Sequence, residues 1–160
     1  MLNPTRNTLP EAVRGQSVEH LNRLLAAAID LHAQLKQAHW NVRGPNFIAV
    51  HELFDKVSTK AEDISDMLAE RVGALGGTAH GTVQLSAERS FLVPYPLGLA
   101  DGEKHIFAVA GTLAAFGQDV QEGITKATKM ADVTTADLLT EVSRTIDMQL
   151  WFVESHAAHK

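Results

Sequence analysis

Residues 47–75 read FIAVHELFDKVSTKAEDISDMLAERVGAL. This stretch predicts one long helix, because it contains no proline and its only internal glycine is Gly73. Asn46 stands where a side-chain oxygen can accept a free backbone N–H at the helix start. Gly76 and Gly77 follow as residues that tolerate the positive φ of a helix end. The predicted helix is therefore bounded on both sides by residues suited to that place.

Three further stretches carry apolar residues at helical spacing. They cover about residues 17–42, 103–129 and 135–156, and Ser17 is the expected N-cap of the first. The residues expected to face inward are Leu21, Leu24, Leu25, Ala28, Leu31, Leu35 and Ala38 in the first stretch, Ile106, Val109, Leu113, Phe116, Val120 and Ile124 in the second, and Leu138, Val142, Ile146, Leu150 and Val153 in the third.

The connection between the second and third helices is long, covering residues 78–102. It is rich in glycine and proline, and we expect it to carry a short helix near residues 86–91. Such a connection lets the third helix start from the opposite end of the bundle. We therefore predict an all-α fold, a ferritin-like four-helix bundle with a long crossover between helices two and three. The expected division is a flexible N-terminal tail over 1–16 and one bundle domain over 17–160.

Composition limits the class of protein. The 160 residues suffice for one domain, and 45% hydrophobic with 21% charged residues is typical of a globular chain. A net charge of -5 disfavours binding nucleic acid through the overall field. The absence of cysteine excludes disulfides and thiolate metal sites. No apolar run is long enough to span a membrane, and residues 1–16 lack the apolar core of a signal peptide. We therefore expect a soluble cytoplasmic protein with no membrane partner.

Two familiar metal motifs are missing. No Glu-x-x-His pair is present, so a di-iron site inside the bundle is not expected. The run from His51 to Asp55 resembles the motif of zinc proteases, but Asp55 stands where the second histidine belongs. A metal site must therefore be built from other residues.

The helix over 47–75 places His51, Asp55, Asp66 and Glu70 within a stripe about 100° wide. Imidazole and carboxylates on one face suit iron, manganese or zinc. Asp55 and Asp66 lie about 16 Å apart along the helix axis, so one ion held at about 2 Å cannot contact both. The alternative interpretation is a solvated acidic face that binds no metal.

A second copy of this helix removes the obstacle of distance. The pairs 51/70 and 55/66 are centred on the same point of the sequence, between residues 60 and 61. In an antiparallel pair of helices with a two-fold axis there, the first member of each pair on one chain faces the second member on its partner. Symmetry then gives two shared sites per dimer.

His39 lies at the end of the first helix, in the run HWNVRG over residues 39–44. A helical hairpin would bring it near His51, where it would add a nitrogen ligand. The alternative is a histidine that only interacts with the dipole at its helix C-terminus. Trp40 is expected to pack, or to intercept stray oxidising equivalents beside a redox metal.

Three runs carry a family resemblance: HWNVRGPNF at 39–47, HELFD at 51–55 and DISDMLAER at 63–71. Together with YPL at 95–97 and LWFVES at 150–155, they resemble the Dps family, the DNA-binding proteins from starved cells. The resemblance extends over essentially the whole chain after residue 16.

This resemblance implies a bacterial dodecameric shell with ferroxidase sites at its two-fold interfaces. Fe(II) is oxidised there, with hydrogen peroxide or oxygen, and the Fe(III) is stored inside as ferric mineral, which protects against oxidative damage. His39, His51 and Asp55 of one subunit, with Asp66 and Glu70 of its partner, are then the catalytic and iron-binding residues.

The resemblance also implies acidic pores for iron entry near the start of the fourth helix. Asp132 and Asp137 are the candidates, followed by Asp119. Asp137 has the alternative role of supporting an N-terminal helix turn. Four other histidines are expected to have surface or packing roles, with metal binding as the alternative: His20, His32, His80 and His105.

Binding to DNA is expected to be weak. The tail has only Arg6 and Arg14 as basic residues, and the C-terminal end carries His156 and His159. The negative charge of each subunit opposes contact with DNA, whereas protonated histidines would favour it at lower pH. The alternative function is a nucleoid-associated structural protein that binds and protects DNA. A third interpretation is an inert helical dimer.

Overall fold

The structure, a computed structural model, describes residues 2–99 and 101–157. Every regular element in those two ranges is a helix, as the sequence predicts. The helices are α1 (Glu11–Asn41), α2 (Phe47–Ala74), α3 (Val83–Arg89), α4 (Gly102–Lys129) and α5 (Val133–Glu154). None of these helices is long and apolar enough to span a membrane. His159, named above for DNA binding, lies outside the described residues.

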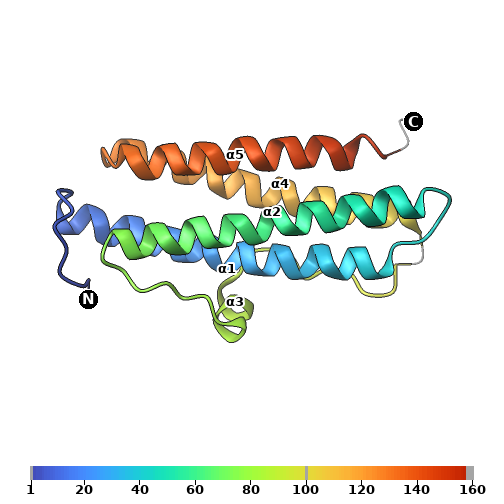
Figure 1. Ribbon diagram of the computed structural model, residues 1–160, viewed down its shortest axis with the longest axis horizontal. Helices are drawn as coiled ribbons and strands as arrows, with labels where there is room; N and C mark the ends of the chain where they lie inside the picture. Colours follow the sequence, from blue (N-terminus) through green and yellow to red (C-terminus); the bar gives the residue numbers. More distant parts are fainter. Residues whose placement is uncertain (1, 100, 158–160) are drawn as a thin grey trace.

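Four long helices form two packed hairpins. α1 packs mainly against α2, and α4 packs mainly against α5 (Figure 1). The crossover after α2 runs back along the bundle, with α3 beside α1, so that α4 begins near the end where α2 began. The predicted crossover is therefore confirmed. Its short helix starts at Val83, because Thr82 caps it by accepting a hydrogen bond from the backbone N–H of Leu85.

The core follows the predicted stripes closely. All inward residues expected in α1 are buried, and so are most of those in α4 and α5. Ile124, Leu138 and Leu150 are only partly buried. α1 is also buried on a further side at Ala26, where the Ser86 hydroxyl of α3 donates to the Ala26 carbonyl at 2.7 Å. The crossover thus covers α1 as well as connecting two helices.

The first helix starts earlier than the sequence predicts. It begins at Glu11, where the Pro10 carbonyl accepts from the backbone N–H groups of Val13 and Arg14. Arg14 also donates to the Leu75 carbonyl at 2.9 Å, which fixes this turn to the end of α2. Ser17 as N-cap is therefore wrong, and residues 11–16 of the expected tail are helical.

α2 begins and ends close to the predicted residues. Asn46 precedes it, but its side chain makes no capping hydrogen bond, so that part of the prediction is wrong. At the other end Gly76 adopts φ +82°, and its carbonyl accepts from the Asn3 N–H at 2.7 Å. The positive φ explains why glycine follows this helix.

Asp132 joins α1, α2 and α5. Its buried carboxylate accepts from the Ser17 hydroxyl at 2.7 Å, from Arg71 at 3.0 Å, and from the N–H and hydroxyl of Thr135. Burial raises the pKa of Asp132, but the hydrogen bonds from Thr135 and Ser17 and the charge of Arg71 together lower it below 3.8. The resulting stabilisation is present above pH 3.8 and is lost as the pH falls through the folded-state pKa.

His20 lies in the packed seam between α1 and α4. Its Nε2 is buried and has no hydrogen-bond partner among the described residues. The ring lies so close to Gly123 of α4 that any Cβ there would collide with Nε2. Burial lowers the pKa of His20, and Lys126 and Arg23 lower it further, whereas Asp119 and Glu122 oppose them. This seam therefore favours the neutral imidazole.

We expect the free energy of unfolding to fall as the pH falls through 6.5, the ordinary histidine pKa. The unfolded chain then binds a proton at this position more readily than the folded chain. His20→Gln should reduce this slope, and the exposed His156→Gln should leave it unchanged. Urea unfolding on both sides of pH 6.5 measures the effect. Equal slopes in wild type and His20→Gln would contradict it.

Candidate metal centre

His39 and His51 face each other across the hairpin of α1 and α2. Their rings are stacked, with centroids 3.7 Å apart and planes inclined by 23°. The Nδ1–H of His39 donates to the His51 carbonyl at 2.7 Å, and the Nδ1–H of His51 donates to the His39 carbonyl at 2.8 Å. The His39 carbonyl lies in the last turn of α1, where carbonyls lack partners within the helix. The pairing that the sequence suggests for these two residues is therefore present.

These hydrogen bonds define the tautomer of both rings. A carbonyl oxygen can only accept, so each Nδ1 carries the proton. In the neutral ring the lone pair is then on Nε2, the form in which an imidazole binds a metal. Each ring thus presents one nitrogen suited to ligation, and His39 is oriented by α2 rather than by the end of its own helix.

Asp55 follows His51 by one helical turn and lies beside the pair. Its Oδ1 is 4.0 Å from the Nε2 of His39 and 2.6 Å from the Nζ of Lys36. The hydrogen bond from Lys36 is the main cause that lowers the pKa of Asp55. Lys36 was not identified from the sequence, although it precedes His39 by three residues and therefore shares its helix face.

Asp66 and Glu70 lie on the same helix but away from the histidine pair. Both side chains are exposed, and neither forms an ion pair with another described residue. Within residues 2–99 and 101–157, no three histidine or acidic side chains come together as a metal site. Asp66 lies about 16 Å along α2 from Asp55, and Glu70 lies farther still, so one chain does not bring the five predicted residues together.

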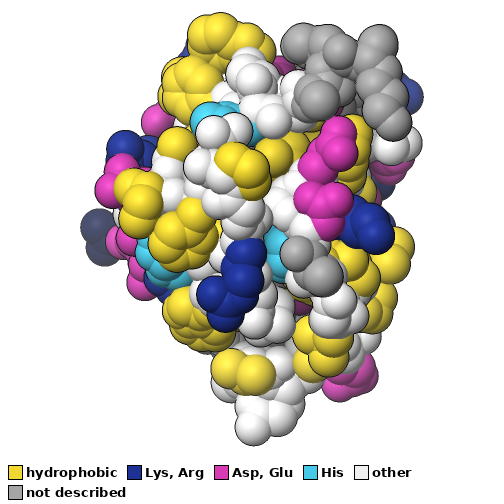
Figure 2. Space-filling model, turned by 90° about the vertical axis from the view of Figure 1, so that its right-hand side faces the viewer, with side chains coloured by type: hydrophobic (Ala, Val, Ile, Leu, Met, Phe, Trp, Pro, Cys, Tyr) yellow, Lys and Arg dark blue, Asp and Glu magenta, His cyan; other side chains and the backbone are white. Residues whose placement is uncertain are grey.

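Apolar side chains surround the histidine end of the bundle. Phe47 lies 5.0 Å from the His51 ring, and Ile48 on the next position is exposed. Trp40 is 64% exposed, so it does not pack inside its own chain. Trp151 and Phe152, near the end of α5, are exposed as well. Figure 2 faces this end and shows hydrophobic side chains beside histidine on the surface.

Two of the other histidines form hydrogen bonds within the subunit. His105 is buried, with its Nδ1 2.6 Å from the Tyr95 hydroxyl and its Nε2 3.2 Å from the Leu99 carbonyl. Burial raises the pKa of Tyr95 to about 12. His32 contacts Ser58, and the packing role favoured by the sequence holds for His105.

The predicted pore residues differ in their exposure. Asp132 is fully buried inside the subunit, so its assignment to a pore is wrong. Asp119 is 8% exposed and pairs with Arg23 at 2.9 Å, which also argues against a pore role. Asp137 is exposed on the first turns of α5, and its pore role stays a prediction.

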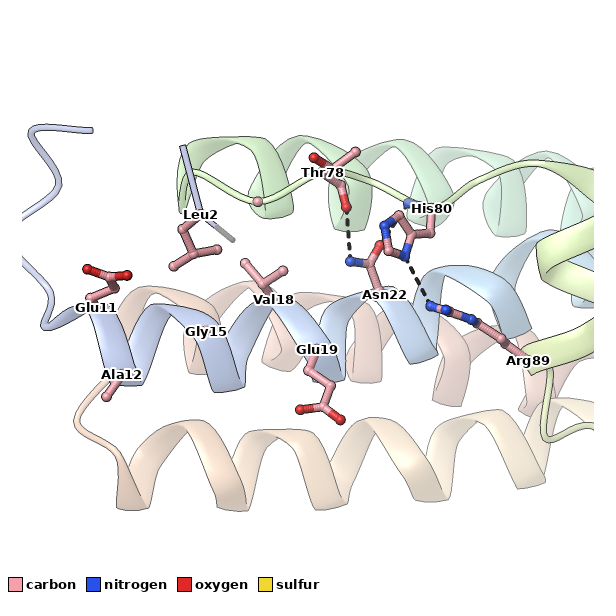
Figure 3. A pocket seen from close by; sticks show the side chains of 11 residues that line it. Leu2, Glu11, Ala12, Gly15, Val18, Glu19, Asn22, Thr78, His80 and Arg89 are labelled. Carbon is pink, nitrogen blue, oxygen red and sulfur yellow. Dashed lines mark hydrogen bonds between the residues drawn. The ribbon is translucent and has the colours of Figure 1, made fainter. Parts of the chain in front are cut away.

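A hollow lies elsewhere, between the start of α1 and the crossover. It has a volume of about 850 Å³ and is lined by residues that include Glu11, Glu19 and His80 (Figure 3). Asn22 donates to the Thr78 carbonyl at 3.1 Å, and the contact between Arg89 and His80 measures 3.0 Å. This hollow contains none of the five predicted ligands, and no pattern in the sequence indicates it.

Known proteins match this chain in sequence over most of its length. The family described as Ferritin-like domain matches residues 18–159. A protein named DNA protection during starvation protein, from Agrobacterium fabrum, is 39% identical over 98% of this chain and 96% of its own length.

Solved structures agree over the same length. DpsC from Streptomyces coelicolor superposes with a TM-score of 0.94, at 29% identity over 100% of this chain and 94% of that chain. A Dps from Microbacterium arborescens, in its high iron form, gives a TM-score of 0.85 at 33% identity, covering 98% of both chains.

Proposed function

This chain belongs to the Dps family of ferritin-like proteins, and from that premise we propose that it is a ferroxidase that stores iron. Fe(II) is the substrate, and hydrogen peroxide or oxygen is the oxidant. The product is kept as ferric mineral inside a dodecameric shell in the bacterial cytoplasm. The observation that carries the proposal is the pair His39 and His51, whose Nε2 atoms are both in the ligating form.

The site is completed by a second subunit. One chain supplies His39, His51 and Asp55, and the partner's Asp66 and the partner's Glu70 complete the ligand set. Two observations support this division. Asp66 and Glu70 are exposed and lie far along α2 from Asp55, and the pairs 51/70 and 55/66 are symmetric about the middle of α2. Exposed apolar side chains around the histidines are also typical of a protein interface, in which a partner subunit would bury them.

The ligand set suits the reaction. Carboxylates and a small number of imidazoles bind iron, and carboxylates stabilise the Fe(III) that forms. Each peroxide accepts two electrons, one from each of two Fe(II) ions, and takes up two protons to leave two waters. Paired electron transfer releases no hydroxyl radical, so iron removal and peroxide removal protect the cell together.

When Fe(II) and hydrogen peroxide are supplied in the absence of oxygen, we expect one hydrogen peroxide to be consumed for every two Fe(II) ions oxidised. A spin trap should then detect little hydroxyl radical, because both electrons reach the same peroxide. Peroxide consumption and spin-trap signal, measured in parallel, test the proposal. Free iron in the same buffer is the control. A one-to-one ratio with abundant radical would mean that the iron reacts as it does in solution.

DNA protection by contact is a second candidate function, because the Agrobacterium fabrum relative is named for protecting DNA. Each subunit carries a net charge of -5, which opposes contact with phosphates. Arg14, one of the basic residues of the N-terminal segment, is buried against α2. We therefore propose that protection works through iron rather than through binding.

We expect plasmid DNA to be retarded weakly at pH 6 and not at pH 8, at low salt. Protonated histidines add positive charge at the lower pH. A gel-shift series with the assembled protein measures this. Tight binding at pH 8 would favour the nucleoid-associated function instead.

A further inference from the structure

Lys36 forms an ion pair with Asp55, the carboxylate of the candidate metal centre. It lies on α1 one turn before His39, and its Nζ is 2.6 Å from the Oδ1 of Asp55. The same oxygen is the one that lies 4.0 Å from the Nε2 of His39. The ammonium group and the imidazole therefore approach one oxygen atom.

The Nε2 of His39 and the Oδ1 of Asp55 lie close to the separation of two ligand atoms on one ion. A transition metal holds imidazole nitrogen and carboxylate oxygen at about 2.0–2.2 Å each. Two ligand atoms of one tetrahedral ion at these bond lengths lie about 3.4 Å apart. The 4.0 Å between the Nε2 of His39 and the Oδ1 of Asp55 would therefore have to close slightly when an ion binds. A divalent ion and an ammonium group on the same oxygen would repel each other strongly. Ion binding and the contact with Lys36 are therefore in competition.

A second place for the ammonium group lies close by. Trp40 follows Lys36 by one helical turn, and Nζ is 5.8 Å from the centroid of its ring. An ammonium group within about 6 Å of an aromatic centroid is attracted to the face of the ring. A small rotation of the lysine side chain would therefore replace the carboxylate contact with a closer contact to the indole.

We propose that Lys36 competes with the metal for Asp55 and moves onto the face of Trp40 when a divalent ion binds. Lys36 is a positioning residue that pairs with Asp55, so that an ion must gain the imidazoles and the partner's carboxylates to displace it. The proposal rests on the proposed function, because it takes the divalent ion to bind at His39 and Asp55.

Zinc titration of the assembled protein tests the competition. Zn(II) takes similar ligands and is not oxidised. Lys36→Met keeps the length of the side chain without the charge, and it should bind Zn(II) roughly fivefold more tightly, the upper range for loss of one exposed ion pair. Lys36→Arg keeps the charge and should bind like wild type. Lys126→Met, which removes a lysine from the exposed pair with Glu122, is the matched control. Unchanged affinity in Lys36→Met would overturn the proposal.

Tryptophan fluorescence tests the movement. Trp151→Phe leaves Trp40 as the only tryptophan, and in this background Zn(II) should change the emission. The change should be absent when Lys36→Met is added, because no ammonium group then moves. An equal change in both proteins would mean that zinc affects Trp40 directly, and would overturn the proposed movement.

The two proposals fail in different ways. If wild type binds no Zn(II), or if His51→Ala leaves Zn(II) binding unchanged, the proposed iron site itself is wrong. If wild type binds Zn(II) and His51→Ala weakens this binding, but Lys36→Met leaves the affinity unchanged, only the proposed competition is wrong.

Discussion

Shells assembled from a mixture of His51→Ala and Glu70→Ala subunits should oxidise iron, although shells of either variant alone should not. Each variant alone damages every site, because every site draws on both halves of the ligand set. An interface between unlike subunits contains one site with both changes and one site with neither. With equal amounts and random mixing, about a quarter of all sites are intact. The initial rate of Fe(II) oxidation measures the recovery.

A second mixture provides the matched control. Asp66→Ala and Glu70→Ala lie in the same half of the site, so an interface between these subunits contains no intact site. This mixture should stay inactive under identical assembly conditions. Recovery in both mixtures, or in neither when mass spectrometry shows mixed shells, would contradict a site shared between subunits.

Asp132→Ala should reduce the free energy of unfolding by about 3–5 kcal/mol, because it removes one partner of a buried ion pair. Arg71 would lose its anion, the Ser17 hydroxyl would lose its acceptor, and α5 would lose its N-cap. Urea unfolding followed by circular dichroism measures the change.

Two further variants test whether the loss of stability comes from the buried contacts of Asp132. Asp132→Asn keeps an acceptor oxygen for Thr135 and should cost less than Asp132→Ala. Asp137→Ala removes an exposed carboxylate from the same helix and should change stability by no more than about 0.5 kcal/mol. Equal effects of Asp132→Ala and Asp137→Ala would show that Asp132 does not join the helices energetically.

The sequence predicts the helices well where local signals act alone. Gly76 follows the end of α2 as predicted, because glycine adopts a positive φ without steric cost. The start of α1 was misplaced, since it depends on contacts with residues distant in sequence. Arg14 reaches Leu75, and the Ser17 hydroxyl is used by Asp132, which no local pattern reveals.

The site shows the same contrast between pattern and contact. Helical spacing groups His51 with Asp55, and the hairpin brings His39 to His51, both of which follow from the sequence. The competition at Asp55 could not be predicted, because Lys36 and Asp55 come from different helices and their contact depends on side-chain conformation. The pore assignment of Asp132 was wrong because its burial depends on residues distant in sequence. An acidic residue near a helix start does not by itself indicate whether its side chain is buried.

The exchange of hydrogen bonds between the two histidines and the main chain has a consequence for tolerance to change. In many metal sites a neighbouring carboxylate orients the imidazole, and its loss weakens the site. Here each orienting group is the other histidine's own carbonyl oxygen, which every amino acid possesses. No substitution elsewhere in the chain removes either acceptor, provided that the two helices keep their register. The pair is therefore a self-contained unit that a designer could transfer to another antiparallel helical hairpin.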